Sequence, residues 1–160
     1  MTIVTRVLKN SYASNFMSKA LDCALTAFNN DEVPVGAIVV LNGEIIGQGS
    51  NNSISSSNVF GHAEINAIND ATKRLGNYRL NGASLFSTLE PCHMCAMAMV
   101  HARIKNLYFG AKEPKTGAVV SVDNFLDKDF LNHKVNYSGG HMERESSALL
   151  RDFFATKRKI

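Results

Sequence analysis

The alternation of short apolar runs with segments of helical periodicity is the feature that most constrains the fold. Runs rich in apolar and β-branched residues predict five strands, at 35–41, 44–49, 83–89, 106–111 and 133–137. Apolar spacing and residues that start or stop helices predict four helices, at 14–28, 62–75, 92–104 and 143–159. Because alternating strands and helices imply at least some parallel pairing, the order predicts a layered α/β sheet.

Length and composition predict one domain. The chain has 160 residues, of which 45% are apolar, and this is enough for one core. We expect a short N-terminal extension over 1–13 and a single domain over 14–160. Asn42-Gly43 favours a hairpin turn between the first two predicted strands. No apolar run reaches the roughly 18 residues that a membrane-spanning helix needs, so we expect no membrane partner.

Charge and cysteine usage narrow the class of protein further. The net charge of +3 permits an anionic partner without demanding one, and the basic residues Lys157–Lys159 close the chain. Three cysteines, two of them in a C-x-x-C, are unlike the disulfide framework of a secreted protein. Reduced cysteines and the lack of a secretory signal predict a cytoplasmic location.

The C-x-x-C predicts a metal site. Cys92 and Cys95 stand at i and i+3 in the first turn of a predicted helix, where both sulfurs share one face and the helix dipole favours thiolates. Zinc accepts cysteine sulfur and histidine nitrogen, and His62 at the start of another predicted helix can supply a third ligand. Three protein ligands leave one position for water, as in catalytic zinc sites.

Glu64 is the candidate catalytic residue of this site. It follows His62 by two residues and can take a proton from the zinc-bound water without binding the metal. A redox pair of the thioredoxin type explains neither residue, and a purely structural zinc leaves Glu64 unexplained. The combined pattern H-x-E…P-C-x-x-C is the known signature of zinc nucleobase deaminases.

From about Phe16 to Lys157 the sequence resembles the bacterial tRNA-specific adenosine deaminases of the cytidine deaminase-like superfamily. The resemblance rests on the stretches "EVPVGAIVV", "HAEINAI", "NYRLNGASLFSTLEPCHMCAMAMVHARI", "FGAKEPKTGA", "NHKV" and "SALLRDFF". It implies a three-layer α/β/α sandwich with a central mixed five-stranded sheet. It also implies a homodimer that converts adenosine to inosine at the wobble position, 34, of a tRNA anticodon stem-loop.

The resemblance assigns roles to individual residues. One zinc ion per subunit would be bound by His62, Cys92 and Cys95, with Glu64 as the catalytic proton shuttle. The residues that would bind the RNA substrate are Asn51, Ala63, Glu113, Lys115 and Phe154, with the basic tail Lys157–Lys159 facing phosphates. Phe153 is expected in the core.

Two stretches depart from the family pattern. "SNVFG" at Ser57–Gly61 stands where the family usually has an Asp-Pro-Thr-like run. Glu113 stands where the family often has an aspartate that touches a ribose hydroxyl, and its side chain is one methylene longer.

Two other functions remain open from the sequence. One is a deaminase of a free base or nucleoside of the guanine or cytosine type, which ammonia release from such substrates would identify. The other is a zinc-stabilised RNA-binding module without catalysis, for which replacement of Glu64 would have no activity to remove.

Overall fold

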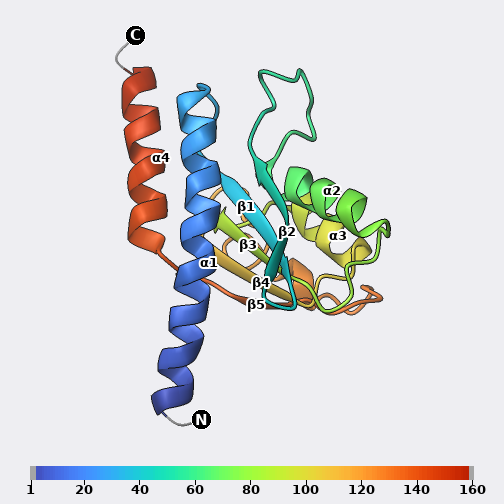
Figure 1. The fold of residues 1–160 in the computed structure, drawn as a ribbon. Coiled ribbons are helices and arrows are strands. Elements are labelled where there is room, and N and C mark those ends of the chain that lie inside the picture. The colour runs from blue at the N-terminus through green and yellow to red at the C-terminus, as the bar shows by residue number, and fades with distance from the viewer. Residues whose placement is uncertain (1–2, 159–160) are drawn as a thin grey trace.

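The protein folds into a mixed five-stranded sheet between two layers of helices (Figure 1). The computed structural model describes the backbone of residues 3–158 and the side chains of residues 11–158. The elements in chain order are α1 (Ile3–Asn29), β1 (Gly36–Leu41), β2 (Glu44–Ser50), α2 (Ala63–Leu75), β3 (Ser84–Leu89), α3 (His93–His101), β4 (Asn106–Ala111), the 3₁₀ turn η1 (Phe125–Asp127), β5 (Asn136–Ser138) and α4 (Glu143–Arg158).

The sheet has the strand order β2-β1-β3-β4-β5. β1 pairs antiparallel with β2 through the predicted hairpin, and also antiparallel with β3. β3, β4 and β5 are parallel to one another, so their connections must cross over a face of the sheet. The carboxyl end of β3 leads directly into α3, and this connection carries Pro91 and Cys92.

Both faces of the sheet are covered. α1 and α4 lie side by side on one face, and α2 and α3 lie on the other (Figure 1). Successive residues of β1 therefore enter different cores: Val39 joins the larger one with α2 and α3, whereas Ile38 and Val40 join the smaller one under α1. Burial on both faces explains why the central strands read as continuous apolar runs rather than as alternating patterns.

The fold class and the mixed five-stranded sheet are as predicted, and the differences concern boundaries. α1 begins at Ile3 rather than at residue 14, so much of the expected extension continues this helix. The last strand is shorter and later than predicted, at Asn136–Ser138. Lys159, which the sequence analysis placed in the last helix, lies outside the described residues. Within residues 3–158, no helix has both the length and the apolar character needed to cross a membrane.

Candidate metal centre and substrate cavity

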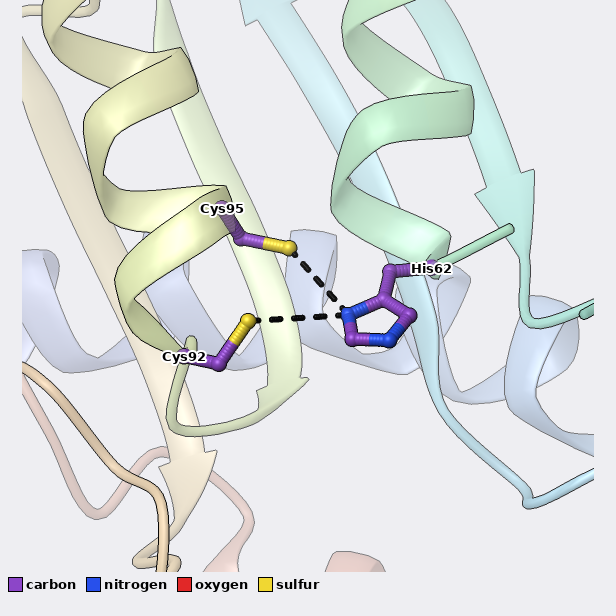
Figure 2. Close-up of side chains that lie close together, drawn as sticks. All are labelled: His62, Cys92 and Cys95. Carbon is purple, nitrogen blue, oxygen red and sulfur yellow. Dashed lines mark hydrogen bonds between the residues drawn. The ribbon is translucent and has the colours of Figure 1, made fainter. Parts of the chain in front are cut away.

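The three predicted zinc ligands meet where two helices begin. His62 is the N-cap of α2, Cys92 is the N-cap of α3, and Cys95 lies in the first turn of α3. Their side chains point toward one another across the gap between the two helix ends (Figure 2). Both helices direct their positive dipole ends to this point, which favours the anionic form of the cysteine sulfurs.

The spacing of the ligand atoms fits zinc. His62 Nδ1 lies 3.6 Å from Cys92 Sγ and 3.5 Å from Cys95 Sγ, and all three ligand atoms lie within 4.8 Å of one another. Zinc–sulfur bonds of about 2.3 Å and zinc–nitrogen bonds of about 2.0–2.1 Å, at tetrahedral angles, separate nitrogen from sulfur by about 3.6 Å. The three side chains are therefore arranged to hold one zinc ion, with His62 binding through Nδ1.

The pKa values of the two thiols are shifted in opposite directions. A hydrogen bond from the Cys95 thiol, helped by His62, lowers the pKa of Cys92 to about 4. The same contact with Cys92, together with burial, raises the pKa of Cys95. The hydrogen bond to Cys92 also raises the pKa of His62. The metal-free cluster thus keeps protons that a bound dication displaces.

Glu64 is a buried carboxyl group in the first turn of α2, beside the metal-ligand cluster. Its side chain is 4% exposed. Burial raises the pKa of Glu64 above its usual value, although contact with the Cys95 thiol offsets part of this shift. A carboxyl group with a raised pKa can both take and return a proton near neutral pH.

A cavity of about 120 Å³ adjoins the cluster. Its walls come from the segment before β1, the end of β3, the loops after β2, β3 and β4, and the N-terminal ends of α2 and α3. The lining residues are Val33, Val35, Asn51, His62, Glu64, Leu89, Glu90, Cys92, Glu113 and Thr116. Three predicted site residues, Asn51, Glu64 and Glu113, therefore face one space.

Asn51 is held in a defined orientation. Its side-chain Oδ1 accepts the backbone N–H of Ala63 at 2.8 Å. The N–H of Ala63 is therefore engaged within the protein, and the Asn51 Nδ2 group carries the donors that remain for a ligand.

Glu90 is a functional candidate that the sequence analysis missed. It is 2% exposed and lines the cavity next to Cys92. Backbone N–H groups of Glu113, Val119, Val120 and Ser121 donate to its carboxylate at 2.9–3.1 Å, and the Ser121 hydroxyl donates as well. Burial alone would raise the pKa of Glu90, but these donors outweigh it and lower the pKa. The only local signal was a carboxylate at the end of an apolar strand.

The buried carboxylate of Glu32 holds the loop over 51–61. Glu32 is 3% exposed and accepts the backbone N–H of Ser55 at 2.7 Å and that of Ile54 at 3.3 Å. The loop projects beyond the end of β2 (Figure 1) and exposes Val59 and Phe60, which belong to the segment that departs from the family pattern.

The remaining predicted substrate residues do not line the cavity. Lys115 is exposed in the loop after β4, and its backbone N–H donates to Glu113 Oε1 at 3.0 Å. Phe154 lies half exposed on α4, whereas Phe153 is buried as expected. Lys157 pairs with Asp31 and lies over the ring of Phe153, so its charge is already partnered within the protein.

Comparison with known families supports the reading of this site. Residues 10–111 match the family model described as the cytidine and deoxycytidylate deaminase zinc-binding region. The tRNA-specific adenosine deaminase of Agrobacterium fabrum is 45% identical over 91% of this chain and 95% of its own length. That of Bacillus subtilis is 40% identical over 90% of this chain and 89% of its own length.

Solved structures agree with this. A structure from studies of A-to-I editing by tRNA:A34 deaminases at the wobble position of transfer RNA has a TM-score of 0.83 and 44% identity, covering 85% of this chain and 99% of that one. A guanine deaminase from Bacillus subtilis is more distant, with a TM-score of 0.60 and 29% identity over 91% of this chain and 93% of that one. The chain belongs to the tRNA-specific adenosine deaminases, a family of zinc enzymes that share the cytidine and deoxycytidylate deaminase zinc-binding region.

Proposed function

We propose that this protein deaminates adenosine to inosine, by hydrolysis, at position 34 of a tRNA anticodon, and releases ammonia. The observation that carries the proposal is the meeting of His62, Cys92 and Cys95 beside the buried Glu64, in a chain of this family. The substrate is inferred from the family, and the hydrolytic chemistry is inferred from the geometry of these four residues.

In this proposal His62 Nδ1 and the sulfurs of Cys92 and Cys95 bind the zinc. Bound zinc supplies a nucleophile derived from water at neutral pH. Glu64 takes the proton that this water loses and delivers it to N1 of adenine as hydroxide adds to C6. Glu64 would then take the proton of the new C6 hydroxyl and pass it to the departing amine, so that water and adenosine become inosine and ammonia.

Asn51 orients the base. Because its Oδ1 is engaged with Ala63, its Nδ2 group faces the ligand as a donor and suits an acceptor nitrogen of a purine. Ala63 contributes through this contact and through its place between His62 and Glu64. A base must leave its stack to enter such a cavity, and the unpaired anticodon loop makes that step inexpensive.

The RNA outside the cavity meets the other predicted residues. Glu113 lines the cavity and would accept a hydrogen bond from a ribose hydroxyl, while Lys115 and Arg158, in the last turn of α4, would face phosphates. Phe154 offers an exposed ring to a nucleotide that flanks the reacting one. We further propose that the protein acts as a homodimer in the cytoplasm and that each subunit holds one zinc ion.

A substrate panel tests the proposal against a deaminase of free bases. Zinc-loaded protein is incubated with an anticodon stem-loop that contains adenosine 34, with adenosine, with guanine and with cytosine, and ammonia is measured. We expect release from the stem-loop at a rate at least about 100-fold above that from each small substrate. Equal or faster release from guanine or cytosine would instead assign the protein to the free-base deaminases.

A further inference from the structure

Glu90 joins the metal centre to the loop over 112–121. It stands between the end of β3 and the Pro91-Cys92 connection, and five donors from that loop converge on its carboxylate. Two of these donors reach Oε1 and three reach Oε2. An ionised carboxylate has about four lone-pair sites and no donor, so it suits such a cluster of N–H groups.

Several contacts hold the shape of this loop, and Glu90 receives the largest share of its backbone N–H groups. The loop is irregular between β4 and η1, so most of these N–H groups have no partner in a sheet or helix. The Ala118 N–H donates to the Pro91 carbonyl at 2.9 Å, and the N–H groups of Gly117 and Lys115 donate to Glu113 at 2.8 and 3.0 Å. Four N–H groups of the loop donate to Glu90, which is more than any other residue receives from it.

Close packing supports the same conclusion. A Cβ atom at Gly117 would lie 2.4 Å from Glu90 Cδ, 2.5 Å from Glu90 Oε1 and 2.5 Å from the Glu113 carbonyl oxygen, so only glycine lets the loop pass this close to both residues. This loop brings Glu113 and Thr116 to the cavity wall. The N–H of Glu113 is itself one of the donors to Glu90, at 3.1 Å.

We propose that Glu90 is a positioning residue for the RNA substrate, because its carboxylate holds Glu113 and Thr116 against the cavity without touching the reacting atoms. The inference rests on the proposed function and adds a residue to it. The two buried carboxyl groups of this site then have different roles. Glu64 moves protons, and Glu90 holds the part of the cavity wall that contacts the nucleotide.

A double-mutant cycle tests this role. Glu90→Gln keeps the size of the side chain but leaves one acceptor oxygen and turns an NH₂ group toward the backbone donors. We expect it to lower kcat/KM for the adenosine-34 stem-loop about 10- to 100-fold, mainly through KM, while the zinc content stays at that of the wild type. Because part of the effect of Glu90 passes through Glu113, the two losses should not multiply, and the variant Glu90→Gln/Glu113→Ala should be more active than the product of the single losses predicts.

Two further variants control the cycle. Asp70→Asn removes a carboxylate that accepts the Gln48 N–H at 3.0 Å but does not line the cavity, so it reports the effect of such a loss on the fold alone. Its KM should equal that of the wild type. Ser121→Ala removes the hydroxyl donor to Glu90 Oε1 without altering the carboxylate, and it should raise KM in the same direction by a smaller factor, which again does not multiply with that of Glu113→Ala.

The outcomes distinguish a failure of the positioning role of Glu90 from a failure of the proposed function. A wild-type protein that makes no inosine contradicts the proposed function. An active wild type whose Glu90 and Glu113 losses multiply, or whose Glu90→Gln variant keeps its KM, overturns the positioning role. If Glu90→Gln does not yield folded protein, the cycle of Ser121→Ala with Glu113→Ala decides by the same criterion.

Discussion

Asn51 Oδ1 accepts the backbone N–H of Ala63 at 2.8 Å, and this contact fixes which end of the amide meets the substrate. Oδ1 is therefore engaged within the protein, by the residue that lies between His62 and Glu64 in the chain. The donors on Nδ2 are left for the cavity that Asn51 lines. One hydrogen bond thus couples the start of α2 to the polarity of the substrate site.

The first prediction concerns this polarity. Asn51→Asp keeps an acceptor for the Ala63 N–H but offers the base no donor, so we expect inosine formation to fall about 10- to 100-fold. Thermal unfolding should stay close to that of the wild type, because the internal hydrogen bond remains. Single-turnover rates on the stem-loop measure the effect. An Asn51→Asp variant that works at the wild-type rate would show that the amide donates nothing to the substrate.

The second prediction concerns Glu64. Glu64→Gln retains the shape of the side chain but cannot carry protons, and general acid–base catalysis contributes roughly 10²- to 10⁴-fold. We expect a loss in kcat of that size, with zinc content and binding of the stem-loop unchanged. Elemental analysis and a binding titration accompany the rate measurement. Residual activity above a tenth of the wild type would assign proton transfer to another group.

The third prediction concerns metal loading. At neutral pH the metal-free cluster holds Cys92 as thiolate, because the pKa of Cys92 is about 4, while the raised pKa of Cys95 keeps that thiol protonated. Zinc requires both sulfurs deprotonated, so adding zinc to chelator-treated protein should release about one proton or more per chain and restore activity. A pH indicator in weak buffer measures the release. Zinc binding with no release of protons would contradict this assignment.

The fourth prediction concerns stability and pH at a site remote from the metal. Burial lowers the pKa of His141 below the unfolded value of 6.5, and its Nε2 lies 2.9 Å from Ser138 Oγ. Below about pH 6.5 the unfolded chain takes up a proton that the folded imidazole resists, so stability falls as the pH drops through that value. Above it, both states are neutral and the effect vanishes.

The test compares the wild type with His141→Gln by urea unfolding at pH 7.5 and pH 5.5, both without zinc. The free energy of unfolding of the wild type should decrease more than that of the variant, by at most about 1.4 kcal/mol, because pH 5.5 lies one unit below the unfolded pKa. Equal decreases in both proteins would show that His141 does not contribute to the pH dependence.

Local chemistry made the metal centre predictable from the sequence. Cys92 and Cys95 share a helix face by their spacing, and thiolates at a helix start need a cation, so His62 and Glu64 followed from what zinc catalysis requires. The strands and the Asn42-Gly43 hairpin followed equally from residue pattern. Each of these signals spans only a few residues, although His62 and Cys92 are 30 residues apart in the chain.

The buried carboxylates of Glu90 and Glu32 could not be found in this way. The donors to Glu90 are 23 to 31 residues away in the chain, and those to Glu32 are 22 and 23 residues away. Their partners are backbone N–H groups, which carry no residue identity, so no pattern marks them. The early part of α1 was missed for a different reason: "TRVLKNSYAS" mixes polar, β-branched and aromatic residues without the regular apolar spacing that marks the rest of the helix.

The most direct test of the account is the fate of adenosine 34 in a full-length tRNA after incubation with zinc-loaded protein. Sequencing and nucleoside mass spectrometry should find inosine at position 34, one ammonia released for each inosine, and no conversion with chelator-treated protein. The opposite finding would be a zinc-loaded protein that binds this tRNA and leaves adenosine 34 unchanged, because the metal centre and Glu64 would then serve some purpose other than deamination.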